Sequence, residues 1–137
     1  MKKIVFIMAL LSSTIINHGQ VISKGNVIGS YIMTVELKPN VTPEEFTTFY
    51  KNKYIPEFEK VVPEARLFLV KGIRGDFKNS FGLIQIFEST EARSKYINDD
   101  GSRTELGKSL IEKVHPLTNE LYKLGSIKMD YNDWLVL

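Results

Sequence analysis

Residues 81–96 read FGLIQIFESTEARSKY, and this stretch decides the fold. Its first seven residues are apolar on both faces except Gln85, which predicts a strand inside a sheet. Ser89 is a favoured helix N-cap residue, so a helical segment is expected to begin directly after it and to run to Ile97. Ala92 and Tyr96 are four residues apart and are expected to face the sheet together.

The preceding residues predict the other half of a hairpin. Residues 66–73 (RLFLVKGI) are rich in apolar and branched side chains and predict a strand. Residues 74–80 (RGDFKNS) form a polar turn, so the two strands should pair antiparallel. Within this turn, the Arg74-Gly75-Asp76 tripeptide is typical of any exposed turn and indicates no adhesion function by itself.

Further towards the N-terminus, a strand and a helix are expected. Residues 31–37 alternate, with one buried face made by Tyr31, Met33, Val35 and Leu37. Thr42, Pro43 and Glu45 predict a capped helix start. An aromatic stripe at helical spacing follows: Phe46, Phe49, Tyr50, Tyr54 and Phe58. Pro56 interrupts this pattern and predicts a kink or two short helices.

The C-terminal third predicts a long helix and a last strand. Residues 98–101 break the preceding helix, and Ser102 to Glu105 spell a second capping box. Apolar residues then recur every three or four positions up to Gly125, the expected C′ residue, with a kink near Glu112 caused by Pro116. Residues 126–137 are expected to form a strand that ends in WLVL.

This order of elements predicts an α+β domain over residues 30–137. It is the ferredoxin-like βαββαβ arrangement, with a four-stranded antiparallel sheet and both helical segments on one face. The opposite face carries Ile32, Ile84, Ile86 and either Leu69 or Val70. A homodimer would cover that face and the apolar C-terminal tail. The alternative is that the lead-in, residues 21–29, covers the face instead.

The N-terminus has the pattern of a secretory signal peptide, residues 1–20. Two lysines precede thirteen uncharged residues, 4–16, and a short polar stretch, with a cut expected after Gln20. A retained anchor or a first buried element is the alternative. Export to the periplasm or the medium is therefore expected, with residues 21–29 as a flexible lead-in and no membrane contact after cleavage.

Composition limits the functions further. The chain has no cysteine, which excludes disulfides, thiolate metal sites and a cysteine nucleophile. Of its 18 basic and 16 acidic residues, two lysines lie in the predicted signal, so the mature part is neutral. A neutral, mixed surface gives no electrostatic footprint for nucleic acid. We expect no metal site, because the mature part has one histidine.

Two segments resemble the dimeric α+β barrel superfamily: Tyr54-Ile55-Pro56-Glu57-Phe58 and the F-E-S-x-E-A-x-x-x-Y pattern of residues 87–96. This superfamily includes antibiotic-biosynthesis monooxygenase-like, stress-responsive A/B-barrel and EthD-like proteins. The resemblance spans residues 30–137 and implies a homodimer with a pocket between each sheet and its helices. Cofactor-free monooxygenases, isomerases and haem-degrading enzymes occur among its members. Tyr54 stands where EthD-like members often carry a histidine.

Seven residues are candidates for a site. His115 could be a general base or, as in haem-handling relatives, a haem ligand; a boundary residue is the alternative. Tyr50 and Tyr54 could orient a flat aromatic ligand or serve as catalytic phenols, or they could simply pack in the core. The candidate ligand-binding residues are Asn52, Arg66, Glu36 and Trp134. Glu36 alternates with the apolar residues of its strand, so it is expected to face solvent. Trp134 is expected to pack in the dimer interface.

The predicted function is therefore binding of a small hydrophobic or aromatic molecule by an exported homodimer, without a cofactor. Monooxygenase or isomerase activity is one extension of it. The alternatives are a non-catalytic dimerisation module whose pocket is filled by its own side chains, and a protein that binds or degrades haem.

Overall fold

The computed structural model describes residues 22–137, so the predicted signal peptide lies outside the described residues. The elements are β1 (Val27–Leu37), α1 (Pro43–Phe49), the π-helical segment η1 (Tyr50–Tyr54), α2 (Ile55–Val61), β2 (Ala65–Lys71), β3 (Phe81–Phe87), α3 (Thr90–Ser94), α4 (Glu105–Leu124) and β4 (Gly125–Leu135). Within residues 22–137, no helix has the length and apolarity that crossing a membrane requires.

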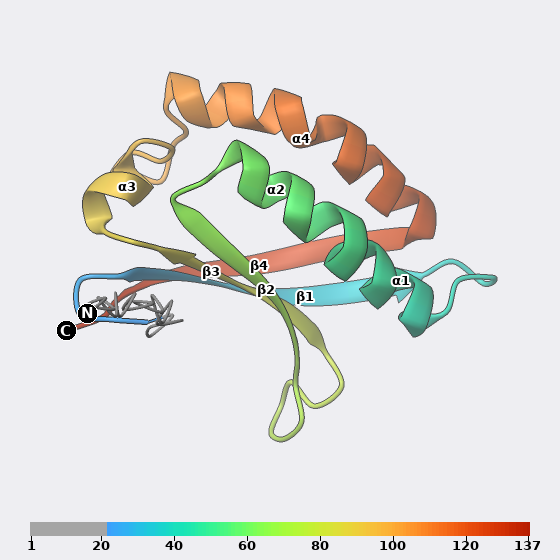
Figure 1. The fold of residues 1–137 in the computed structure, drawn as a ribbon. Helices are drawn as coiled ribbons and strands as arrows, with labels where there is room; N and C mark the ends of the chain where they lie inside the picture. Colours follow the sequence, from blue (N-terminus) through green and yellow to red (C-terminus); the bar gives the residue numbers. More distant parts are fainter. Residues whose placement is uncertain (1–21) are drawn as a thin grey trace, which may run out of the picture.

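The four strands form one antiparallel sheet in the order β2-β3-β1-β4. All helices lie on one side of it, and the loop between β2 and β3 projects from the other side (Figure 1). The ferredoxin-like βαββαβ arrangement predicted from the sequence is confirmed.

Strand register assigns the residues to the two faces. Met33 pairs with Phe81 and Met129, and all three point towards the helices. Ile84 pairs with Ser30 and Phe68 on the opposite face, which we call the outer face. Leu69 pairs with Leu83 on the helix side. The sequence left Leu69 and Val70 as alternatives for the outer face, and the register selects Val70.

The first helical run begins as predicted and contains the expected irregularity. The Thr42 hydroxyl accepts from the Glu45 backbone N–H at 3.1 Å, and the Glu45 carboxylate accepts from the Thr42 N–H at 2.7 Å. Before Pro56 the helix widens into η1, where the Ile55 N–H donates to the Tyr50 carbonyl five residues back. The wider turn admits a proline without breaking the helix, and such turns often occur at functional sites.

Several predicted boundaries were wrong. Strand β1 begins at Val27, so three residues of the predicted lead-in belong to the sheet. Helix α4 is capped by Thr104, whose hydroxyl accepts from the Gly107 N–H at 3.0 Å, and not by Ser102. It continues through Pro116 to Leu124. Strand β2 ends at Lys71 and β4 at Leu135, each two residues before the predicted end.

Gly125 ends α4 as predicted, but for a different reason. Its φ of 174° is extended, so no left-handed cap forms. A Cβ at this position would lie 2.4 Å from the Glu36 carbonyl oxygen. Glycine is therefore required because β4 starts in close contact with β1.

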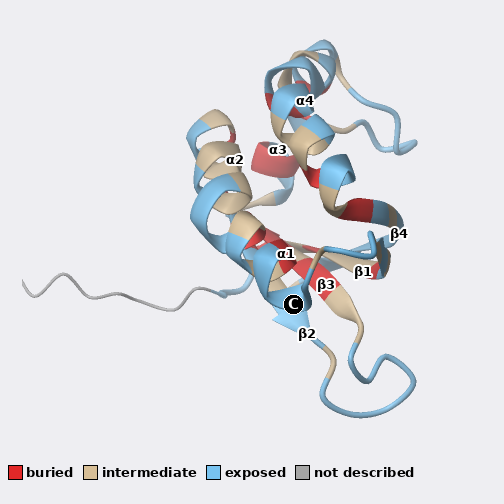
Figure 2. Ribbon diagram, turned by 90° about the vertical axis from the view of Figure 1, so that its right-hand side faces the viewer, coloured by how far each residue is buried: buried red, intermediate tan, exposed pale blue. Residues whose placement is uncertain are grey.

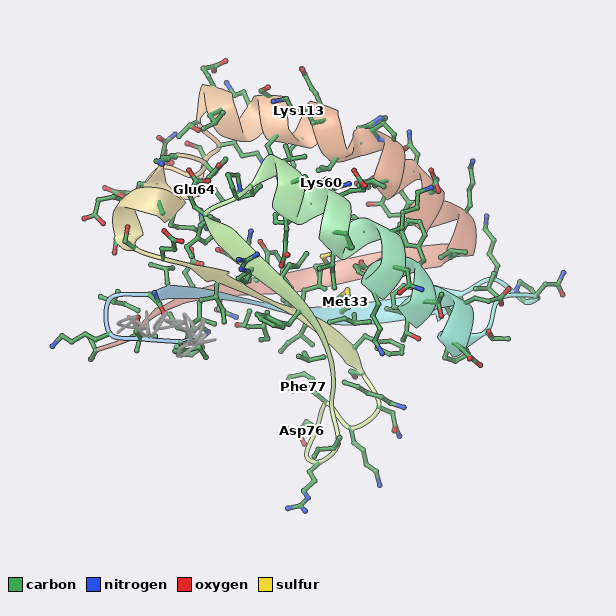
Figure 3. All side chains as sticks on the ribbon, viewed as in Figure 1. Met33, Lys60, Glu64, Asp76, Phe77 and Lys113 are labelled. Atoms are coloured by element: carbon green, nitrogen blue, oxygen red, sulfur yellow. The ribbon has the colours of Figure 1, made fainter. Side chains whose placement is uncertain are left out.

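The core lies between the sheet and the helices. Buried residues lie in β1, β3, α3 and α4, whereas the β2–β3 loop is mostly exposed (Figure 2). Met33 lies at the centre of this layer, and Asp76 and Phe77 lie in the projecting loop (Figure 3). Strand β4 is poorly covered: Met129 and Tyr131 point to the helix side and are still 43% and 38% exposed. This uncovered half of β4 opens the interior next to α3.

Candidate functional site

An inner cavity of about 190 Å³ lies between the sheet and the helices α2 and α4. Its walls are mostly aromatic and aliphatic side chains from every layer of the fold. The residues that line it are Tyr31, Tyr54, Phe58, Leu67, Leu83, Gln85, Phe87, Tyr96, Ile97, Arg103, Gly107, Leu110, Ile111, Val114 and Met129.

One polar pair lies on the sheet floor of this cavity. The Tyr31 hydroxyl donates to Gln85 Oε1 at 3.1 Å, and Gln85 is buried on the central strand β3. Burial raises the pKa of Tyr31 to about 12. Burial also raises the pKa of Tyr54. Both phenols are therefore neutral at neutral pH, and neither serves as a base there.

Tyr96 closes the α3 end of the cavity and is held from outside. Its hydroxyl donates to Glu64 at 2.8 Å, and Lys95 pairs with the same carboxylate at 2.8 Å. The Lys95 hydrogen bond, followed by the Tyr96 bond, lowers the pKa of Glu64 to about 2. Burial, followed by the Glu64 bond, raises the pKa of Tyr96 to about 12. The ring thus faces the cavity while its hydroxyl is engaged elsewhere.

A second, outer cavity of about 850 Å³ adjoins the first. It lies between α3, the loop 97–103 and the uncovered half of β4. Four residues line both cavities: Tyr31, Ile97, Arg103 and Met129. The two cavities therefore form one cleft, apolar at its inner end and polar at its mouth. The side chains of Arg93, Tyr131 and Asp133 belong to the mouth, and Trp134 borders it with its indole turned to the outer face.

Arg93 is the least expected residue of this cleft. It is 5% exposed, and its guanidinium carbon lies 5.6 Å from the ring centroids of both Phe87 and Tyr131. Nη2 donates to the Tyr131 hydroxyl and, at 2.6 Å, to Asp133. Within residues 22–137, neither Nε nor Nη1 has a hydrogen-bond partner. Buried guanidinium donors are normally paired, so these N–H groups require an explanation.

Local structure holds Arg93 in this place. The Ser89 hydroxyl caps α3 by accepting from the Ala92 N–H at 3.1 Å, and Ala92 is buried against the sheet. On β1, Gly29 leaves room for the Tyr131 ring, since a Cβ at Gly29 would lie 3.1 Å from it. The Tyr131 hydroxyl also donates to Asp133. A short capped helix and a glycine together place the arginine, tyrosine and aspartate in contact.

Two of the predicted site residues line the cleft. Tyr54 lines the inner cavity and stacks with Phe58, with ring centroids 6.4 Å apart. Trp134 lines the outer cavity, and its indole N–H donates to the Ser30 hydroxyl at 2.9 Å. Tyr50, in contrast, is fully buried, with its hydroxyl 3.7 Å from the Met33 sulfur. Tyr50 therefore packs in the core, which is the alternative that the sequence left open.

The other four candidates lie away from the cleft. His115 is exposed on α4 and lines neither cavity; its Nδ1 lies 3.2 Å from the Asn119 side-chain nitrogen. Asn52 is exposed on η1. Arg66 is exposed at the edge of the sheet, where its guanidinium lies 3.5 Å from the carboxylate of Glu59 on α2. Glu36 is exposed on the outer face, as its parity indicated.

The inner cavity does not fit haem. At about 190 Å³ it is too narrow for a macrocycle, and His115, the expected haem ligand, lines neither cavity. Among residues 22–137, no group of three or more histidine, aspartate or glutamate side chains is placed to hold a metal ion.

The sequence contained one signal for the missed residues. Ile127, Met129 and Tyr131 alternate on the inward face of the last strand, and Asp133 continues the same parity. A carboxylate on an inward face indicates a cation packed against it. Which cation could not be read from the sequence, because Arg93 lies 40 residues earlier.

No protein-family model and no curated protein matches this chain. Among solved structures, it is similar to a variant of SnoaB, a cofactor-independent oxygenase from Streptomyces nogalater, at 16% identity over 79% of this chain and 91% of that chain, with a TM-score of 0.48. It is also similar to a protein from Arabidopsis thaliana at 14% identity over 81% and 95%, with a TM-score of 0.46. A dimeric protein of unknown function and ferredoxin-like fold from Bacteroides fragilis matches at 10% identity over 82% and 97%, with a TM-score of 0.38.

Proposed function

We propose that this protein is an exported homodimer that binds a small, flat aromatic or apolar molecule in the inner cavity of each subunit. The observation that carries the proposal is the make-up of this cavity. Mostly apolar side chains surround a hydrogen-bonded pair, Tyr31 and Gln85, on its floor. Ligand sites have this character, with mostly apolar walls and a few placed polar groups.

The size of the cleft sets the kind of ligand. The inner cavity, about 190 Å³, is smaller than the roughly 300 Å³ at which ligand pockets begin. Taken alone it would favour the alternative of a non-catalytic module. Arg103 and Met129 line both cavities, so the ligand is expected to extend past them into the outer cavity.

The state of the phenols supports binding over acid–base catalysis in the inner cavity. The raised pKa values of Tyr31 and Tyr54 mean that neither phenol acts as a base at neutral pH. Tyr54 can donate a hydrogen bond to a ligand, whereas the Tyr31 oxygen can only accept one, because its proton is donated to Gln85. An oxygenase or isomerase activity would have to draw its base from the outer cavity, where Asp99 and Asp133 lie, or from the substrate.

The outer face of the sheet supports the homodimer. Phe68 and Val70 are exposed there, and the loop that projects on this side exposes Ile73 and Phe77 (Figure 3). The described part of the lead-in reaches only one end of the sheet, where Gly25 and Asn26 bond to Val136. A second copy that packs face to face would remove these side chains from water.

Filling the inner cavity is expected to abolish binding. Leu110→Phe adds an aromatic ring at a residue of α4 that lines the cavity. Leu117→Phe makes the same change at a half-buried leucine of α4 that is not among the lining residues, and it serves as the matched control. Titration with naphthamide, read by isothermal titration calorimetry, checks the prediction.

The expected result is a loss of naphthamide affinity of about tenfold or more for Leu110→Phe, since the ring takes the space of the ligand. Leu117→Phe should bind like the unchanged protein. Equal affinities for the two variants, or no binding by the unchanged protein, would leave the non-catalytic module as the better account.

A further inference from the structure

The mouth of the cleft contains a buried cation whose donors are only half used. Arg93 contributes Nη2 to Tyr131 and Asp133, while its Nε and Nη1 have no partner within the described residues 22–137. A buried N–H without an acceptor is costly, and a bound ligand or an ordered water normally supplies one.

We infer that the ligand of this cleft carries a carboxylate, which accepts hydrogen bonds from Nε and Nη1 of Arg93 while its aromatic body occupies the inner cavity. This inference rests on the proposed function, because it names the polar end of the same ligand. The two sites are contiguous, since Tyr31 and Met129 line both cavities.

An ionised acceptor suits this arginine better than a neutral one. Hydrogen bonds between two charged groups are roughly twice as strong as neutral ones. Asp99 and Asp133 also line the outer cavity, so its formal charges with Arg93 and Arg103 are balanced. The case for an acceptor therefore depends on the unpaired donors and not on an excess of positive charge.

The contacts around Arg93 keep it in place for this task. Asp133 and Tyr131 hold one edge of the guanidinium, and Phe87 packs against its plane. The ring of Tyr131, which is partly exposed, also lies against the guanidinium. This ring has to shift before a ligand oxygen can reach Nε and Nη1. Asp133 and Tyr131 are thus positioning residues, and Arg93 is the group that contacts the ligand.

Two ligands of one shape separate this inference from the proposed function. Naphthoate and naphthamide share the same rings and differ in the charge of the head group. The unchanged protein is expected to bind naphthoate about tenfold more tightly than naphthamide, as charge-assisted bonds require. Isothermal titration calorimetry gives both affinities, and the NMR signal of the Arg93 Nε–H should shift with naphthoate only.

The variant Arg93→Lys tests whether Arg93 is the residue that binds the carboxylate. Lysine keeps the charge and can still pair with Asp133, but it lacks the Nε and Nη1 donors. It should lose most of the preference for naphthoate and keep the affinity for naphthamide, which also shows that the cavity is intact. Arg66→Lys, the matched control at an exposed arginine that lines neither cavity, should keep the preference.

The outcomes are distinct. Equal affinities of the unchanged protein for the two ligands would overturn the carboxylate inference and leave the proposed function standing, with water on the Arg93 donors. Binding of neither ligand would overturn both. A preference for naphthoate that survives in Arg93→Lys would overturn the assignment to Arg93.

Discussion

Ile84→Arg is expected to convert the protein from a dimer to a monomer. Ile84 lies on β3, a central strand, and its side chain points to the outer face. If the outer faces of two copies pack together, each new guanidinium enters an apolar contact without an acceptor. We expect a penalty of about 3 kcal/mol or more, which corresponds to a dissociation constant raised about a hundredfold.

Light scattering at micromolar concentration measures the change directly. Tyr122→Arg is the matched control, because Tyr122 is exposed on α4, on the opposite side of the sheet. This variant should keep the mass of two subunits. A monomer in the unchanged protein, or an unchanged mass for Ile84→Arg, would contradict a dimer through the outer face.

Phe46→Ala is expected to lower the free energy of unfolding by about 3–5 kcal/mol. Phe46 is fully buried and anchors α1 to the sheet. Its ring centroid lies 5.0 Å from that of Tyr50 and 5.1 Å from that of Phe81. Truncation leaves a void in the middle of this aromatic cluster, and backbone relaxation closes such voids only in part.

Chemical denaturation of Phe46→Ala checks the stability loss. Tyr122→Ala removes an aromatic ring from an exposed position and should change the stability by no more than about 0.5 kcal/mol. Similar losses in the two variants would mean that the helical layer is not anchored through Phe46. The cavity beneath it would then lack the rigid cover that ligand binding requires.

The fold could be predicted because its signals are local. Thr42 and Glu45 form a capping box within four residues, and the alternation of residues 31–37 fixes which face of β1 is buried. Pro56 predicted an irregular helical turn, which the structure shows as η1. Such signals depend on neighbours in sequence, and each agrees with the global arrangement.

The site could be predicted only in part, because it depends on contacts between distant segments. Tyr54 and Trp134 were identified from their chemistry and line the cleft. Arg93 was missed because a single arginine in a short polar helix is typical of a solvent-exposed position. Its burial depends on Tyr131 and Asp133 of β4, which only the folded chain brings against α3.

His115 shows the opposite error. It is the only histidine of the predicted mature part, and a catalytic role was predicted for it from the chemistry of histidine alone. It is exposed on α4 and lines neither cavity, whereas Leu110 and Val114 of the same helix line the inner one. Residue type without position was not sufficient evidence for a role.

Native mass spectrometry of the protein, purified from its source under non-denaturing conditions, tests the central claim most directly. The account predicts subunits that carry a small non-covalent molecule, released on denaturation, with an aromatic or apolar body and an ionisable acid group. A spectrum that shows only subunits without a ligand, from protein that also does not bind added naphthoate or naphthamide, would contradict the account.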